Sequence, residues 1–166
     1  MPVCFGGQSQ QRWGDNTLNP QEYLRDLLLS DTTGTQRSTA LARKAGMLVL
    51  AFVNLEDAAS QQTVAALQTL SNAYGASGKA AIWAVSVQDF TTTAAQVQQH
   101  NLSLPVLVDH DGYHATNYGI TSVPTVFFVD SKGVVLQKTT GWYPQGVQQI
   151  SERLGAFLEM EPVSVA

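Results

Sequence analysis

A seven-residue apolar run, Met47–Val53, is followed after a short turn by a helical pattern over residues 58–74. A run this apolar is typical of a strand that is buried on both faces. After the turn, apolar side chains recur at three- and four-residue spacing and predict a helix with one apolar stripe: Val64, Leu67, Leu70 and Tyr74. The end of such a strand is a favoured place for chemistry, because the helix that follows presents free N–H groups and a partial positive charge.

The rest of the chain predicts further strands and helices in alternation. We expect strands at 47–54, 80–87, 104–108, 125–129 and 134–140, and helices at 38–44, 58–74, 90–100, 113–118 and 144–160, with Phe157 in the stripe of the last helix. Asn19-Pro20 is a helix-start signal, so we expect another helix there, with Tyr23, Leu24, Leu27 and Leu28 on its apolar face. Thr91 is the expected cap of the helix at 90–100. This order predicts a mixed sheet with helices on both faces.

The 166 residues predict a single domain at 19–160, a loose N-terminal arm at 1–18 and a frayed tail at 161–166. A net charge of −4 with nine Lys and Arg residues gives no electrostatic footprint for nucleic acid. No apolar run approaches the roughly 20 residues that span a bilayer. The first residues lack the pattern of a signal peptide, so a cytoplasmic location is the default expectation, and an exported mature form remains open. The sequence leaves the oligomeric state open.

Three segments together resemble the thioredoxin-like superfamily, and more narrowly its TlpA/ResA-type branch, which is related to the AhpC/TSA group. They are the strand and helix at 48–70, the stretch at 104–141 around Val123-Pro124-Thr125, and the closing helix at 146–159. The resemblance implies a three-layer α/β fold with a central mixed sheet flanked by helices and an N-terminal extension. It also implies a cis peptide bond between Val123 and Pro124.

The chain departs from this family at the redox site. Aligned without a gap, the two redox cysteines of the family fall on Asp57 and Ser60. Dithiol exchange needs a thiolate nucleophile and a second thiol, and neither side chain supplies one. Ala51 and Thr63 stand where members of the superfamily carry acidic residues that manage protons. We therefore expect no catalytic residue and no cofactor, and we expect Asp57 to cap the helix by accepting the N–H of Ser60.

A groove for recognition does not depend on the cysteines. By resemblance, relatives hold an extended peptide beside the cis-proline, with main-chain pairing at the residue before it. The matching positions here are Glu56, Val123, Pro124, Trp142 and Tyr143. The sequence thus predicts a redox-inactive domain with a protein or peptide partner. The competing interpretation is that the proline is a relic of the fold and that Trp142 packs on its own hairpin.

Two enzymatic alternatives stay open. A divergent thiol-disulfide oxidoreductase or peroxidase would use Cys4, which is the one cysteine of the chain, or the thiol of a partner. Non-redox catalysis or metal binding would use Asp57 with His110 and His114, because two histidines four apart on one helix share a face. We expect no metal, since the sequence around Asp111 is also that of an ordinary turn into a short helix.

Overall fold

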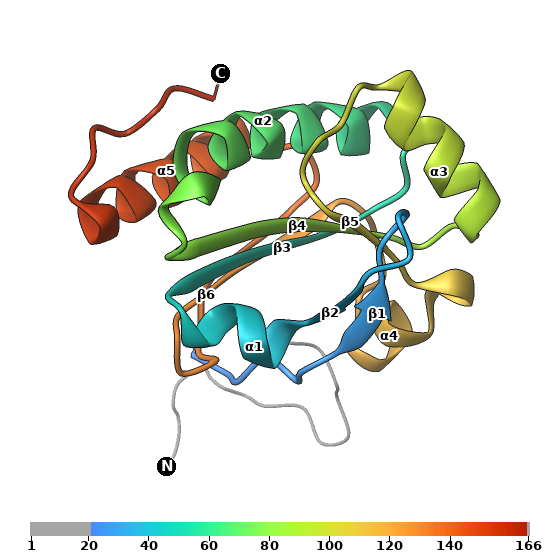
Figure 1. Cartoon of the computed structure of the whole chain (residues 1–166), viewed down its shortest axis with the longest axis horizontal. Coiled ribbons are helices and arrows are strands. Elements are labelled where there is room, and N and C mark those ends of the chain that lie inside the picture. The colour runs from blue at the N-terminus through green and yellow to red at the C-terminus, as the bar shows by residue number, and fades with distance from the viewer. Residues whose placement is uncertain (1–20, 166) are drawn as a thin grey trace, which may run out of the picture.

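The computed structural model describes residues 21–165, which form a five-stranded mixed sheet between two layers of helices (Figure 1). The strand order is β5-β4-β3-β6-β7, with β3, β4 and β5 parallel and with β6 and β7 antiparallel to their neighbours. The bounds are β3 (Met47–Val53), β4 (Ala80–Ser86), β5 (Val106–Val108), β6 (Thr125–Val129) and β7 (Val135–Thr140). The five strands expected from the sequence are therefore confirmed.

β3 lies in the middle of the sheet, which explains its uninterrupted apolar sequence. Side chains of a strand alternate between the two faces of a sheet. Val49 and Val53 pack in one core and Leu48 and Phe52 in the other, and each is fully buried. Both faces of this strand therefore select apolar residues.

The upper layer in Figure 1 consists of α2 (Ala58–Tyr74) and α5 (Pro144–Leu158). The apolar stripe predicted for α2 is fully buried, and it packs with α5 in one core. Its residues are Val64, Leu67, Leu70 and Tyr74. In α5, Val147, Ile150 and Leu154 are buried, but Phe157 is 45% exposed. The expectation for Phe157 is wrong because this residue lies at the margin of the stripe, in the last turn of the helix.

The lower layer consists of α1 (Thr39–Lys44) and α4 (Tyr113–Asn117), with the hairpin of β1 (Leu28–Ser30) and β2 (Gln36–Ser38) beside them (Figure 1). Two short 3₁₀ turns are η1 (Gly75–Ser77) and η2 (His110–Gly112). α3 (Phe90–Gln99) lies toward the end of the sheet where β3 and β4 finish. Its cap is Asp89 rather than the expected Thr91, because the Asp89 carboxylate accepts the Thr92 N–H at 2.7 Å.

The helix expected from Asn19-Pro20 is wrong over the part of it that the structure describes. Residues 21–27 contain no helix: a turn and a bend at 21 and 22 lead to an isolated bridge between Tyr23 and Val134, and Val135 donates its N–H to the carbonyl of Glu22 at 2.7 Å. Leu24 and Leu27 are buried against the lower core. Their spacing indicated a helical face, but the β6–β7 hairpin supplies backbone partners for an extended segment instead.

The tail after Glu161 is held in place rather than frayed. Ser151 on α5 donates its hydroxyl to the carbonyl of Val163 at 2.6 Å, and Val163 donates its N–H to the Tyr74 hydroxyl at 2.9 Å. Val165 donates its N–H to the Gln148 side chain at 3.0 Å. These bonds join the tail to α2 and α5, so the chain end up to residue 165 belongs to the upper layer.

The expected arm at 1–18, with Cys4, lies outside the described residues. Among residues 21–165, no helix combines the length and the apolar character that crossing a bilayer requires.

Candidate functional site

The turn between β3 and α2 is closed by two hydrogen bonds. Asp57 is the N-cap of α2, and its carboxylate accepts the Ser60 N–H at 3.0 Å, as the sequence predicts. The Ser60 hydroxyl in turn accepts the N–H of Asn54 at 3.1 Å, and Ser60 is fully buried. The two positions at which the resemblance implies the redox cysteines of the family are thus occupied by groups that hydrogen-bond to the backbone of the turn.

The two positions at which the resemblance implies acidic, proton-managing residues, Ala51 and Thr63, carry no ionisable group. Ala51 is a fully buried residue of β3. Thr63 is fully buried on α2, and its hydroxyl donates to the Ala59 carbonyl at 2.8 Å. A Thr hydroxyl bonded in this way does not act as a base near neutral pH.

The structure brings the segment around Pro124 next to this turn. The Val123-Pro124 peptide bond is cis. Phe52 pairs with Thr125 in the antiparallel β3–β6 ladder, so continuing that register places the end of β3 beside Pro124. On the other side, Gly141 donates its N–H to the Pro124 carbonyl at 2.8 Å. Three segments that are far apart in sequence therefore meet at one end of the sheet.

The aromatic pair after β7 is positioned by a glycine that the sequence analysis did not single out. Trp142 is half-buried against the upper core, whereas Tyr143 is 47% exposed. A Cβ atom at Gly146 would lie 2.7 Å from Cδ2 of Tyr143 and 2.5 Å from Cγ2 of Thr139. Only glycine lets the Tyr143 ring lie this close to the first turn of α5. A steric requirement of this kind has no signature in a single sequence.

The histidines considered for metal binding are not on one helix. His110 belongs to η2 and His114 to α4, and the left-handed backbone of Asp111 (φ 68°) separates them. The buried Asp109 carboxylate accepts the N–H groups of His114 at 3.0 Å and Ala115 at 2.9 Å, and it lies 3.1 Å from Nδ1 of His114. Across residues 21–165, His, Cys, Asp and Glu side chains form no group of three that fits a metal ion.

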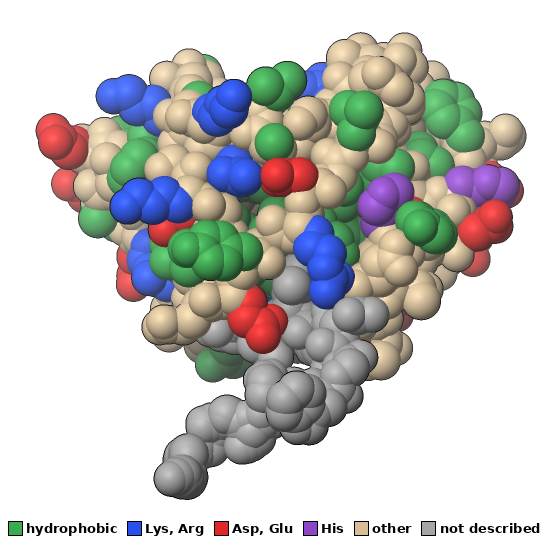
Figure 2. Space-filling view, turned by 90° about the horizontal axis from the view of Figure 1, so that it is seen from below, with side chains coloured by type: hydrophobic (Ala, Val, Ile, Leu, Met, Phe, Trp, Pro, Cys, Tyr) green, Lys and Arg blue, Asp and Glu red, His purple; other side chains and the backbone are tan. Residues whose placement is uncertain are grey.

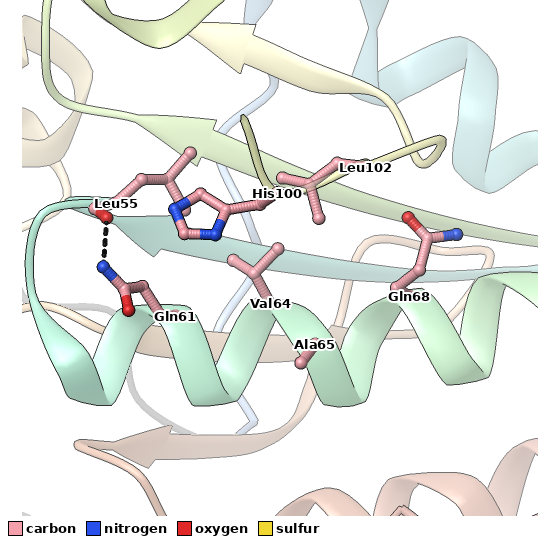
Figure 3. Close-up of a pocket in the computed structure, with 7 residues that line it drawn as sticks. All are labelled: Leu55, Gln61, Val64, Ala65, Gln68, His100 and Leu102. Atoms are coloured by element: carbon pink, nitrogen blue, oxygen red, sulfur yellow. Dashed lines mark hydrogen bonds between the residues drawn. The ribbon is translucent and has the colours of Figure 1, made fainter. Parts of the chain in front are cut away.

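A small pocket that the sequence analysis missed lies beside the start of α2. Figure 3 shows the imidazole of His100 above Val64, between Leu55 and Leu102. Gln61 closes one end by donating its side-chain amide to the Leu55 carbonyl at 2.9 Å. The volume of the pocket is about 220 Å³. Small-molecule sites usually measure about 300–1,000 Å³, so this pocket has room for little more than one side chain.

The profile of the AhpC/TSA family matches residues 20–138. The chain belongs to the AhpC/TSA family. Among curated proteins of known sequence, it is similar to the thiol-disulfide oxidoreductase ResA of Bacillus thuringiensis subsp. konkukian (strain 97-27), with 33% identity over 63 residues. The match covers 38% of this chain and 33% of that relative, so the chain spans about a third of the length of ResA.

Solved structures of family-like proteins confirm the thioredoxin-like fold. A candidate thiol:disulfide interchange protein DsbE from Chlorobium tepidum is similar over 86% of this chain and 99% of its own, with a TM-score of 0.76 and 21% identity. The peroxidoxin BcpB of Mycobacterium tuberculosis is similar over 86% of this chain and 97% of its own, with a TM-score of 0.68 and 18% identity. At these identities the likeness concerns the fold alone.

Proposed function

We propose that this member of the AhpC/TSA family is a redox-inactive thioredoxin-like domain that binds an extended peptide or protein segment. The binding site in this proposal is the Pro124 groove, which consists of Glu56, Val123, Pro124, Trp142 and Tyr143. By resemblance, relatives with this fold do two things: they bind an extended peptide segment, and they exchange a disulfide with it. We propose that this chain has kept the first and lost the second. The first role needs only backbone and surface, whereas the second needs thiols.

The bonding of Asp57 and Ser60 supports the loss of redox chemistry. Each side chain completes the turn before α2, and neither carries sulfur. The chain contains one cysteine in all, so two thiols cannot meet within one molecule. Resolution of a mixed disulfide would then require a thiol from another molecule.

The observation that carries the binding proposal is the free backbone of Val123. Within residues 21–165, neither its N–H nor its carbonyl has a hydrogen-bond partner, and the residue is only partly buried. It lies beside the end of β3, where a sheet-like ladder stops. A peptide that runs alongside can pair with both groups in the manner of an added strand.

The two aromatic residues supply the contact area that such a peptide needs. Tyr and Trp are enriched among residues that dominate binding energy, because they bury a large area with few rotatable bonds. Tyr143 has nearly half of its surface exposed. Its ring packs against the first turn of α5, because Gly146 has no Cβ atom to block it. Glu56 and Asp57, in the turn between β3 and α2, are exposed and acidic, which favours a neutral or cationic segment.

The test is a selection from a phage-displayed library of random linear peptides, followed by fluorescence anisotropy with the enriched peptides. Tyr143→Ala is expected to weaken binding about tenfold or more, as truncation of a central aromatic contact does. Tyr113→Ala is the matched control, because Tyr113 is a 65% exposed aromatic on α4 and is expected to change nothing. A library that yields no binder, or a Tyr143→Ala variant that binds as the wild type does, contradicts the proposal.

A further inference from the structure

One edge of β4 is only half covered by its neighbour. β4 pairs with β3 along its whole length, from Ala80 to Ser86. On the other side β5 has three residues and pairs only with residues 84–86. The first half of β4, residues 80–83, therefore has no strand on that side within residues 21–165.

The hydrogen bonds around β4 identify which backbone groups face the open side. Met47 donates its N–H to the Lys79 carbonyl at 3.0 Å, and Val87 donates its N–H to the Val53 carbonyl at 3.1 Å. Successive residues of a strand alternate in the direction of their N–H and C=O groups, so odd-numbered residues of β4 bond to β3. Ala80 and Ile82 therefore direct both backbone groups toward the open side.

Pro105 explains why the pairing with β5 stops. Ala84 donates its N–H to the Pro105 carbonyl at 3.1 Å, and the same register places the nitrogen of Pro105 opposite the carbonyl of Ile82. Proline has no N–H to donate, so the ladder ends there. Within residues 21–165, the N–H and carbonyl groups of Ala80 and Ile82 have no hydrogen-bond partner, although Ile82 is only 2% exposed. Buried backbone groups without partners are rare and costly, and they favour an added strand.

There is room for such a strand beside this edge. A hollow of about 390 Å³ lies along the first half of β4, and its walls come from α1 on one side and from the end of α2 with η1 on the other. The wall residues are mostly small, which allows a backbone to approach closely: Ala42 on α1 and Ala45 at its C-cap, and Ser71, Gly75 and Gly78 on the other wall. Leu41, at the rim, is 67% exposed and offers an apolar contact.

The surroundings of this hollow are basic, although the whole chain has a net charge of −4. Arg37 lines the hollow, and Lys44 and Lys79 adjoin the lining residues Ala45 and Ala80. The Arg37 guanidinium already donates to the carboxylate of Asp31 at 2.8 Å. The two lysines are exposed and, within residues 21–165, have no carboxylate within 4.0 Å. Figure 2, which views the molecule from below, shows Lys and Arg side chains gathered over the half of the lower layer where α1 lies.

We propose that the open edge of β4 binds an extended acidic segment of a partner protein as an added strand. The segment pairs with the backbone of Ala80 and Ile82 and directs its carboxylates to Lys44 and Lys79. This mode of recognition takes affinity from main-chain bonds and selectivity from side chains at the rim. A second copy of the chain fits less well, because it would bring two basic rims together.

The probe is a capped peptide of alternating Val and Thr with Glu at both ends, compared with the same peptide carrying Lys at both ends. Titration into isotope-labelled full-length protein is followed by NMR, with hydrogen exchange of the Ala80 and Ile82 amides as the readout. The Glu peptide is expected to shift these amides and to slow their exchange, and the Lys peptide is expected to bind about tenfold more weakly or not at all.

Two variants separate the backbone contribution from the charge contribution. Ala80→Pro removes one outward N–H at the first residue of the strand, where proline is tolerated, and it is expected to weaken the Glu peptide about fivefold or more. The double variant Lys44→Glu/Lys79→Glu is expected to reverse the preference between the two peptides. Lys132→Glu, on the exposed turn between β6 and β7, is a single charge-reversal control away from the hollow and is expected to leave both affinities unchanged.

Several results would overturn this assignment. It fails if the Glu peptide leaves the Ala80 and Ile82 amides unshifted, or if neither variant changes its affinity. It also fails if these amides exchange as slowly in the free protein as those of the β3–β4 ladder, since the edge is then already occupied. Slow exchange that depends on protein concentration would assign the edge to a second copy, and slow exchange at every concentration would assign it to the chain itself.

Discussion

Asp57 and Ser60 hold the turn before α2 through two hydrogen bonds that run in opposite directions along the chain. Asp57 accepts from the residue three positions ahead, and Ser60 accepts from Asn54, six positions behind. The first bond follows from sequence alone, because Asp before a helical pattern is a common N-cap. The second could not be predicted, because it depends on how sharply the turn folds back on α2.

Replacing Asp57 with Ala is expected to lower the free energy of unfolding by about 1 kcal/mol, because α2 loses its capping carboxylate. Urea denaturation near neutral pH measures this change. Glu56→Ala is the control, because Glu56 is exposed and bonds to the Asn54 side chain through its backbone N–H, which the substitution keeps. The free energy of unfolding of this variant should stay within about 0.5 kcal/mol of the wild-type value. Equal losses in the two variants would show that Asp57 does not act as the cap.

Asp31 gives the protein a stability that depends on pH. Burial raises the pKa of this carboxyl, but hydrogen bonds from Thr33, Arg37 and Thr35 more than offset it and lower the pKa from 3.8 to about 2. Because the pKa is lower in the folded state, the stabilisation is complete above about pH 4 and is lost as the pH falls toward about 2.

Asp31→Asn is therefore expected to cost about 2 kcal/mol at neutral pH and much less near pH 2. Urea denaturation of wild type and variant at both pH values provides the measurement. A cost that is the same at both pH values would mean that the charge of Asp31 contributes nothing.

At the scale of elements, sequence periodicity predicts β3 and α2 well, because both are locally encoded and both bury what their patterns mark as apolar. Two of the failures concern the segments at the two ends of the described chain. The segment after Pro20 is extended because the β6–β7 hairpin, more than 100 residues later in the chain, pairs with it. A pairing over such a distance leaves no periodic signal in either segment.

The tail is fixed by a buried hydroxyl network that joins three elements. Tyr74, at the end of α2, donates to the Ser151 carbonyl at 3.2 Å and accepts the Val163 N–H. Tyr74→Phe is expected to destabilise the protein by about 1–2 kcal/mol and to speed the exchange of the Val163 amide, because the Ser151 carbonyl and the Val163 N–H both lose the Tyr74 hydroxyl and the Val163 N–H keeps only the Ser151 hydroxyl at 3.1 Å. Tyr113→Phe, at an exposed site, is the control for calorimetry and hydrogen exchange. If the Val163 amide exchanges at an unchanged rate in Tyr74→Phe, the hydroxyl does not anchor the tail.

At the scale of the whole molecule, the fold brings the ends of β3, β6 and β7 together at one end of the sheet. Resemblance predicts that these strand ends meet around Pro124, because the thioredoxin-like fold fixes the order of the strands. It does not predict the open edge of β4, which depends on Pro105 and on the shortness of β5. The meeting of strand ends around Pro124 is therefore a property of the fold, whereas the open edge of β4 is a property of this particular sequence.

The most direct test of the account is the reduction of insulin by dithiothreitol with and without the full-length protein. The wild type is expected to leave the rate at its uncatalysed background, because Asp57 and Ser60 cannot exchange disulfides. The variant Asp57→Cys/Ser60→Cys, which restores two thiols at the start of α2 beside Pro124, is expected to raise the rate well above that background. Turnover by the wild type would contradict the account, and its loss in Cys4→Ser would assign the activity to Cys4.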